Sequence, residues 1–237
     1  MNVLYIIPAR GGSKGLPQKN IKLLCGKPLI SWSIETGIAS KQKFPGRVLV
    51  STDDSKIADV AVKYGAEVPF LRPDELAQDT TPSMDVVLHA INFFQSKGEE
   101  FDLVVMLEPT SPQRDANDII GAIELLITTP TAESVVGVSQ TESAHPAFLV
   151  SIKNGFIFPY GKQAIQVVRR QDIDELFFFE GSMYVSKTES LVKRKSFYHE
   201  KTLGYVMPKW KSFEVDDTVD FIIIESLMNA KKNGLIK

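Results

Sequence analysis

The chain has 237 residues, of which 43 % are hydrophobic, and its formal net charge is −2. This length and apolar fraction suit one large domain or a domain with a substantial insertion, and the near-neutral charge argues against a general nucleic-acid binder. The single cysteine, Cys25, excludes an internal disulfide and indicates a reducing compartment.

Short apolar runs alternate with helical patterns from the first residues onward. Residues 3–8, 47–52 and 103–109 lack polar alternation and are typical of buried parallel strands, and residues 133–139 predict a fourth strand. Helical patterns cover residues 28–40, 55–65, 83–98 and 115–129, with Ser55 as the expected cap of the second helix. The alternation predicts an α/β fold with a mainly parallel sheet.

No run along the chain predicts a membrane partner. Residues 2–8 are too short for a signal peptide, and cations follow this run instead of preceding it. No apolar run approaches the roughly 18–20 residues of a membrane span. We expect a cytoplasmic protein.

The pattern changes near residue 140. Asn154-Gly155 indicates a hairpin, and we interpret residues 140–185 as an inserted lobe and residues 1–139 and 186–237 as the α/β domain. The lobe is rich in phenylalanine, and contiguous apolar surface usually marks an interface, so we expect a two-fold homodimer through it. The chain then returns to a strand end near residue 214 and a final helix.

The loop after the first strand combines glycines with cations. The stretch IIPARGGSKGLPQKN, residues 6–20, carries Gly11 and Gly12 between Arg10, Lys14 and Lys19. Ligands of open α/β sheets bind beyond the carboxyl ends of the strands, and glycines let backbone N–H groups approach an anion. The loop therefore suits a polyphosphate, although it matches neither the Walker pattern nor G-x-G-x-x-G. The alternative is a solvated basic loop.

Five motifs in order resemble the acylneuraminate cytidylyltransferase family, the CMP-sialic acid synthetases. They are IPARGGSKGLPQKNI, FLRPDELAQDTTPSMDVVLHA, MLEPTSPQR, RRQD with FFFEGSMYV, and SFEVDDTVDF. The resemblance covers nearly the whole chain. It implies a Rossmann-like nucleotidyltransferase sheet, Mg²⁺ as cofactor, and transfer of CMP from CTP to a sugar acid with release of pyrophosphate.

The resemblance also implies roles at the nucleotide. Arg10, Lys19 and Asp216 would be catalytic. The triphosphate and ribose would contact the loop, and the base would contact Arg72 and the turn before the third helix. The implied nucleotide-binding residues are Arg10, Gly11, Gly12, Ser13, Lys14, Lys19, Asn20, Arg72, Asp79, Thr80 and Ser83. The alternatives are a surface ion pair for Arg72 and a helix cap for Ser83.

Glu214 and Asp216 are the candidate metal ligands. Their spacing of two would put both carboxylates on one face of a strand, and two carboxylates beside phosphates suit Mg²⁺. The family has aspartate at both positions, so Glu214 departs from it. Asp217 would point to the other face. The alternative is a plain acidic loop.

The acceptor side departs further from the family. Glu108 replaces a usual glutamine and Glu180 a usual asparagine, while Phe178 and Phe148 stand where some members have cations. The resemblance implies sugar contacts from Glu108, Arg170, Glu180 and Tyr184, with Arg169 as an alternative to Arg170. These departures leave the acceptor open between N-acetylneuraminate and another nonulosonic acid, such as a legionaminic- or pseudaminic-type sugar.

We therefore expect a Mg²⁺-dependent cytidylyltransferase that acts on a sialic-acid-like 2-keto sugar acid. The alternatives are a nucleotidyltransferase for a different sugar or base and a non-catalytic nucleotide-sugar-binding regulator.

Overall fold

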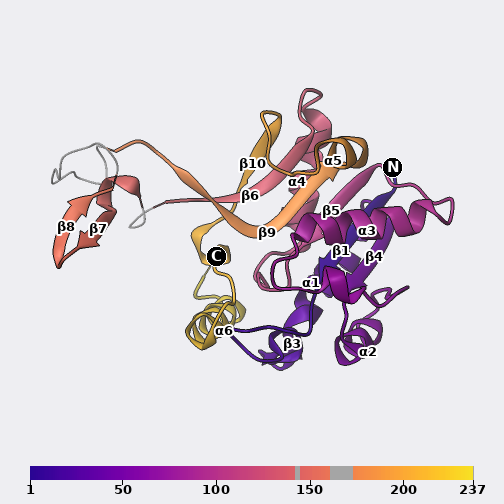
Figure 1. The fold of residues 1–237 in the computed structure, drawn as a ribbon, viewed down its shortest axis with the longest axis horizontal. Coiled ribbons are helices and arrows are strands. Elements are labelled where there is room, and N and C mark those ends of the chain that lie inside the picture. Colours follow the sequence, from indigo (N-terminus) through magenta and orange to yellow (C-terminus); the bar gives the residue numbers. More distant parts are fainter. Residues whose placement is uncertain (142–144, 161–172, 237) are drawn as a thin grey trace.

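The computed structural model describes residues 1–141, 145–160 and 173–236. Its centre is a six-stranded sheet in the order β10-β6-β9-β5-β1-β4 (Figure 1). The strands are β1 (Val3–Pro8), β4 (Gly46–Ser51), β5 (Leu103–Leu107), β6 (Ser134–Gln140), β9 (Phe177–Lys187) and β10 (Thr202–Val206). β1 pairs in parallel with β4 and β5, and β6 pairs in parallel with β10. The predicted α/β fold with a mainly parallel sheet is confirmed.

Strand β9 is the exception to the parallel arrangement. It runs antiparallel between β5 and β6, and its register with β6 shifts between Val136 and Val138. Residues 177–185, which we predicted as part of the inserted lobe, pair with β5 and β6 and so belong to the central sheet. The division of the chain into two domains stays a prediction.

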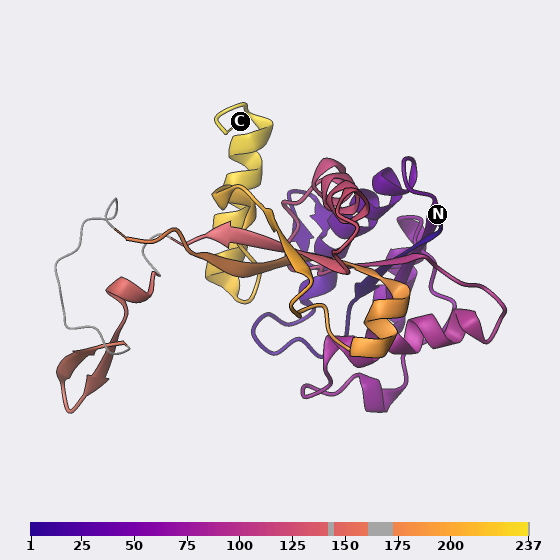
Figure 2. The same ribbon diagram turned by 90° about the horizontal axis from the view of Figure 1, so that it is seen from above.

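Helices cover both faces of the sheet, because every residue of β1 from Val3 to Ile7 is buried and successive side chains of a strand point to opposite faces. Tyr5 and Ile7 pack with α1 (Leu29–Lys41), α2 (Ser55–Lys63) and α4 (Ala116–Thr128). Leu4 and Ile6 pack with α3 (Ser83–Gln95) and α5 (Thr188–Arg194). Figure 2 shows α1 and α4 on one side of the sheet and α3 and α5 on the other.

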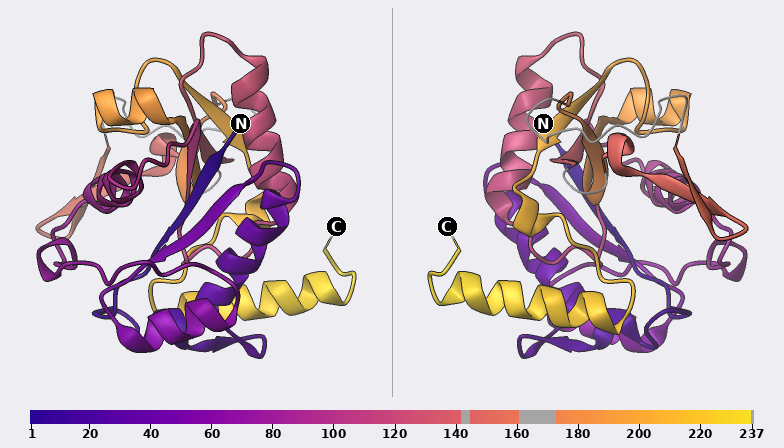
Figure 3. Two further views of the ribbon diagram at one scale, coloured as in Figure 1. Left: turned by 90° about the vertical axis from the view of Figure 1, so that its right-hand side faces the viewer. Right: turned by 90° about the vertical axis from the view of Figure 1, so that its left-hand side faces the viewer.

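A third apolar cluster attaches the last helix, α6 (Thr218–Lys232), to the N-terminal part of the chain. Phe221 and Ile224 of α6 pack against Leu16, Leu24 and Leu29. Leu24 belongs to a small antiparallel pair, β2 (Leu23–Leu24) and β3 (Lys27–Pro28). Figure 3 shows α6 below the sheet and beside this pair. None of the helices in the described part of the chain is long and apolar enough to cross a membrane.

Two local predictions about helix starts and strands are wrong. Asp54, not Ser55, caps α2, because its carboxylate accepts hydrogen bonds from the backbone N–H groups of Lys56 and Ile57 at 2.7 and 3.2 Å. The segment before α6 forms no strand. It is fixed by the N–H of Val215, which donates to the carbonyl of Thr110 at 2.8 Å, and by Asp217, which caps α6 in a reciprocal pair with Asp220.

The predicted hairpin is confirmed and stands apart from the sheet (Figure 1). β7 (Val150–Lys153) and β8 (Phe156–Pro159) pair around Asn154 and Gly155. The φ angles of these two residues are 50° and 84°, as a tight type I′ turn requires. Apolar side chains on the hairpin are exposed, with Ile152 at 70 % and Phe156 at 71 %.

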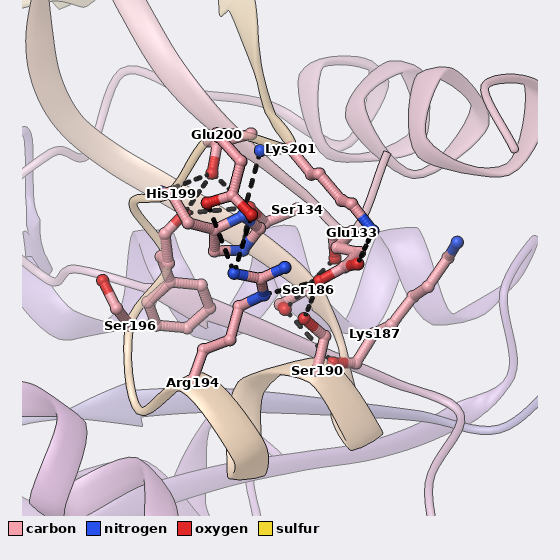
Figure 4. Close-up of polar contacts among 12 residues, drawn as sticks. Glu133, Ser134, Ser186, Lys187, Ser190, Arg194, Ser196, His199, Glu200 and Lys201 are labelled. Carbon is pink, nitrogen blue, oxygen red and sulfur yellow. Dashed lines mark hydrogen bonds and ion pairs between the residues drawn. The ribbon is translucent and has the colours of Figure 1, made fainter. Parts of the chain in front are cut away.

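A polar cluster fixes α5 and the loop before β10 to the start of β6 (Figure 4). The carboxylate of Glu133 accepts hydrogen bonds from Arg194 and Lys201, each at 2.6 Å, and from the hydroxyl of Ser190 at 2.5 Å. These groups hold the pKa of Glu133 well below its usual range. The neighbouring Ser134 hydroxyl lies 2.7 Å from that of Thr202.

Candidate active site

The carboxyl ends of β1, β4 and β5 meet at one edge of the sheet, and the predicted loop lies there. The buried amide of Asn20 donates to the carbonyl of Arg10 at 3.0 Å, and the N–H of Gly11 donates to Asp53 at 3.0 Å. A β-carbon on Gly11 would lie 2.8 Å from a carboxylate oxygen of Asp54. Glycine therefore allows the loop to lie close to the turn that follows β4.

Two loop cations contact one carboxylate. Arg10 donates to Asp79 at 2.6 Å, and Lys14 forms an ion pair with the same carboxylate. Their hydrogen bonds, that of Lys14 first, lower the pKa of Asp79. Asp79 therefore lies beside the cations predicted to hold the triphosphate. Thr80 and Ser83 are exposed in the same turn, and Ser83 is the first residue of α3 and not its cap.

Lys19 links the loop to the segment before α6. Its ammonium group donates to the carbonyl of Val215 at 2.7 Å and lies 3.3 Å from the carboxylate of Asp216. A β-carbon on Gly15 would lie 2.3 Å from the carbonyl oxygen of Asp216, so the two segments touch. The structure thus places Lys19 beside Asp216, which we predicted as a metal ligand.

Arg72 lies in the interior and not in a surface ion pair. Its side chain is 6 % exposed, and its guanidinium donates to the carbonyl and the hydroxyl of Ser51 at the end of β4. Burial lowers the pKa of Arg72, while the carboxylates of Asp53 and Glu108 favour its charge.

Three glutamates from separate segments surround one arginine at this edge. Glu108 follows β5, Glu180 lies in β9 and Glu214 precedes α6, and all three interact electrostatically with Arg114. Arg114 is 3 % exposed. Its guanidinium donates to the carbonyls of Glu108 and Ser111 at 2.8 and 2.6 Å and to the hydroxyl of Ser33 at 2.6 Å. Arg114 is the last residue of the motif MLEPTSPQR, and we predicted no role for it from the sequence.

The three carboxyl groups titrate unusually. Burial raises the pKa of Glu108 to about 7, although Arg114, Arg72 and Lys19 favour its charge. Burial raises the pKa of Glu214 to about 7 as well, and the neighbouring Asp216 adds to the effect. Burial also raises the pKa of Glu180. One of its oxygens accepts hydrogen bonds from Ser182, and the other has no partner within the described part of the chain. At neutral pH Glu108 and Glu214 can therefore donate as well as accept a proton.

Glu214 is positioned by a glycine of β9. Gly181 has a φ of +72°, and a β-carbon there would lie 2.0 Å from a carboxylate oxygen of Glu214. The reason given for pairing Glu214 with Asp216 was wrong, because these residues are in no strand. They are nevertheless close enough for the charge of Asp216 to raise the pKa of Glu214.

Of the remaining predicted sugar contacts, Tyr184 lies in β9 and packs against the ring of Phe197 at 5.3 Å between centroids. Burial raises its pKa, and the charges of Glu108 and Glu214 add to the rise. Arg169 and Arg170 lie outside the described residues. Phe148 and Phe178 are partly exposed, in η3 (Pro146–Phe148) and in β9.

The predicted metal ligands are a pair of carboxylates, Glu214 and Asp216. Within residues 1–141, 145–160 and 173–236, no group of three or more histidine, cysteine, aspartate or glutamate side chains could hold a metal ion. Mg²⁺ commonly takes one or two carboxylates and completes its shell with phosphate oxygens and water. Glu214 and Asp216, beside the loop cations, fit that donor set.

Comparison with known proteins gives one family. The family model described as cytidylyltransferase matches residues 4–206. The chain is 36 % identical over 239 residues to a CMP-N,N'-diacetyllegionaminic acid synthase of Legionella pneumophila, covering 100 % of both chains. It is 32 % identical over 223 residues to a pseudaminic acid cytidylyltransferase of Campylobacter jejuni, covering 93 % of each.

Two further matches are an Escherichia coli protein and a solved structure. The chain is 33 % identical over 242 residues to an N-acylneuraminate cytidylyltransferase of Escherichia coli, covering 98 % of this chain and 54 % of the relative. The structure of a CMP:2-keto-3-deoxy-manno-octonic acid synthetase complexed with CTP aligns with a TM-score of 0.67 at 16 % identity, covering 98 % of this chain and 100 % of that one. At that identity the likeness shows the fold alone.

Proposed function

The chain belongs to the cytidylyltransferase family, and from that premise we propose that it activates a nonulosonic acid with CTP to give a CMP-sugar and pyrophosphate. The observation that carries the proposal is the contact of the cationic glycine loop with the acidic segment before α6, through Lys19 and Asp216. A cation suited to a triphosphate thus lies beside a carboxylate suited to a metal, which supports the proposal. The legionaminic and pseudaminic relatives, which the chain matches over nearly their whole length, support the choice of acceptor.

The residues at this edge have separate tasks in the proposed reaction. The anomeric hydroxyl oxygen of the sugar attacks the α-phosphorus of CTP and releases its proton to water, the bond to the bridging oxygen of the β-phosphate breaks, and pyrophosphate leaves. Arg10, Lys14 and Lys19 neutralise the triphosphate and stabilise the charge that develops on the leaving group. Arg10 and Lys14 become available to CTP when it displaces the carboxylate of Asp79. Glu214 and Asp216 would hold Mg²⁺, which supplies further charge neutralisation when bound.

The acceptor is selected by the buried glutamates. Glu108 and Glu180 face the same arginine, and one oxygen of Glu180 has no hydrogen-bond partner among the described residues. A carboxyl group in this position pairs well with hydroxyl or amide N–H donors and poorly with a sugar carboxylate. We infer an acceptor that directs acylamino or hydroxyl groups toward Glu108 and Glu180.

We also propose that the protein acts in the cytoplasm as a homodimer. The single cysteine supports the compartment, and the exposed apolar hairpin β7–β8 supports the dimer.

The experiment is a pyrophosphate-release assay over a matrix of substrates. CTP, UTP, ATP and GTP are each combined with Mg²⁺ and with N-acetylneuraminate, a diacetyllegionaminate, a pseudaminate or 2-keto-3-deoxy-manno-octonate. We expect release only with CTP and an acylamino-bearing nonulosonic acid. Release with the octonate alone, or with a purine nucleotide, would contradict the assignment. Binding of CTP without release for any acid would favour the non-catalytic regulator.

A further inference from the structure

A cavity of about 730 Å³ lies between α1, α6 and the turn that precedes α4. It is outside the cationic loop and the three glutamates, and it shares only Arg114 with them. A cavity of this size accommodates a small-molecule ligand. The proposed reaction uses none of its other lining residues.

The walls of the cavity carry both tryptophans of the chain, Trp32 and Trp210. Trp32 is fixed by its indole N–H, which donates to the carbonyl of Leu24 at 3.2 Å. Trp210 lies in the short helix η5 (Lys209–Lys211). Aromatic side chains of this kind stack with planar heterocycles irrespective of the exact ring system.

Gln113 provides a hydrogen-bonding group with no partner. It is 5 % exposed and lines the cavity, and neither the nitrogen nor the oxygen of its side-chain amide has a hydrogen-bond partner among the described residues. Buried polar atoms are nearly always paired, because leaving them unpaired costs free energy. An amide offers a donor and an acceptor side by side, which matches the edge of a nitrogen heterocycle or of a carboxamide.

Two cations at the same cavity are also without a carboxylate partner. Lys27, on another wall, is paired with Glu35 at 2.6 Å. Lys231 and Lys232 of α6 line the cavity and form no ion pair within the described ranges of the chain. The ammonium group of Lys231 lies 5.2 Å from the centre of the Trp210 ring. An anionic group held by these lysines would therefore lie beside a stacking surface.

We propose that this cavity is a second small-molecule site, separate from the CTP site, for a nucleotide-type ligand: a planar heterocycle that carries a phosphate. The heterocycle stacks on the tryptophans and pairs with the amide of Gln113, and the phosphate binds Lys231 and Lys232. This proposal does not depend on the identity of the sugar acceptor.

Tryptophan fluorescence can follow binding at this cavity, because both tryptophans of the chain line it. The test titrates the full chain with AMP, GMP, CMP and UMP and follows tryptophan fluorescence. We expect at least one monophosphate to change the emission saturably. The double variant Lys231→Ala/Lys232→Ala should weaken that binding about tenfold or more, because it removes charge-assisted contacts to phosphate. The control Lys63→Ala/Lys193→Ala removes two exposed lysines that do not line the cavity and should bind as the parent does.

A Lys19→Ala variant separates this site from the CTP site. The fluorescence response should persist in it, because Lys19 belongs to the cationic loop and not to the cavity. The proposal is wrong if none of the four monophosphates gives a saturable response. It is equally wrong if the response disappears in Lys19→Ala and is unchanged in Lys231→Ala/Lys232→Ala.

Discussion

At the scale of single residues, the carboxyl group of Glu108 couples stability to pH. Its pKa is about 7 in the folded chain against 4.5 for an ordinary glutamate, because burial disfavours its charge. Between these values the unfolded chain has released the proton and the folded chain keeps it, so the free energy of unfolding falls as the pH rises. Glu108→Gln should reduce this loss of stability with pH. Urea denaturation at about pH 5 and about pH 8 measures the free energy of unfolding at each pH. The same difference between the two pH values in the variant as in the parent chain would contradict the prediction.

The same substitution should alter the choice of acceptor. Glu108→Gln restores the residue usual in the family and removes a group that repels a sugar carboxylate, so we expect the ranking of nonulosonic acids by kcat/KM to change. The apparent affinity for CTP should change little, because in our proposal the triphosphate contacts the loop cations instead. If Glu108→Gln lost most of its affinity for CTP and kept the same ranking of nonulosonic acids, Glu108 would act on CTP and not on the acceptor, and the prediction would be wrong.

The carboxylates of Glu214 and Asp216 should differ in their tolerance to substitution. Asp216→Asn should nearly abolish turnover and leave the fold intact, because Asp216 is exposed at the site and its carboxylate contacts Lys19. Glu214→Asp should keep substantial activity, since a carboxylate remains beside Gly181. Calorimetric titration with Mg²⁺, with and without CTP, provides the second readout. Normal turnover by Asp216→Asn would remove it from the site.

Some site residues could be predicted from the sequence and others could not, for a physical reason. Arg10, Lys14 and Lys19 lie within ten residues of one another in one loop, whose position follows from the strand before it. Arg114 is different, because its importance arises from glutamates at positions 108, 180 and 214 that meet only in the folded chain. The burial of an arginine produces no local sequence pattern. The motif MLEPTSPQR gave one hint, because it contains both an acidic and a basic residue without the periodicity of a surface helix.

At the scale of elements, the local signals of the sequence were sufficient for the first half of the sheet. β1, β4 and β5 are continuous apolar runs, and each is followed by a turn and a helix. β9 was not recognised as a sheet strand, because its antiparallel pairing with β5 and β6 joins segments far apart in the chain. Its first residues, Phe177–Phe179, are exposed and are typical of an interface. Their sequence therefore resembled the lobe that precedes them.

The positive φ of Gly181 in β9 gives a test of how this strand positions Glu214. Gly181→Ala would place a β-carbon on the carboxylate of Glu214 and put alanine at a φ of +72°. The strain should cost roughly 1–2 kcal/mol of stability. Displacement of Glu214 should also lower kcat. Gly98→Ala is the matched control, because its φ is +76° and nothing lies within 4 Å of the added carbon. It should lose stability and keep kcat, and equal kcat values for the two variants would show that Gly181 does not position the site.

At the scale of the whole molecule, the hairpin β7–β8 is exposed among the described residues. It stands away from the sheet and its helices (Figures 1 and 2). Within the described residues, the three buried apolar clusters contain none of its side chains. An isolated two-stranded hairpin is marginally stable in water, so exposed apolar residues on it favour burial against another surface. In the homodimer that we propose, a second copy of the chain would supply that surface by two-fold symmetry.

We therefore expect a homodimer whose assembly depends on this hairpin. Ile152→Glu/Phe156→Glu places two charges on the apolar hairpin and should give a monomer, because burying unpaired carboxylates in an interface is costly. The midpoint of thermal unfolding of the α/β body should change less than the state of assembly, since neither side chain belongs to its core. Light scattering at micromolar concentration measures the mass. Val62→Glu is the control, since Val62 is an exposed apolar residue on α2. A monomeric parent chain, or a double variant that remains dimeric, would refute assembly through β7–β8.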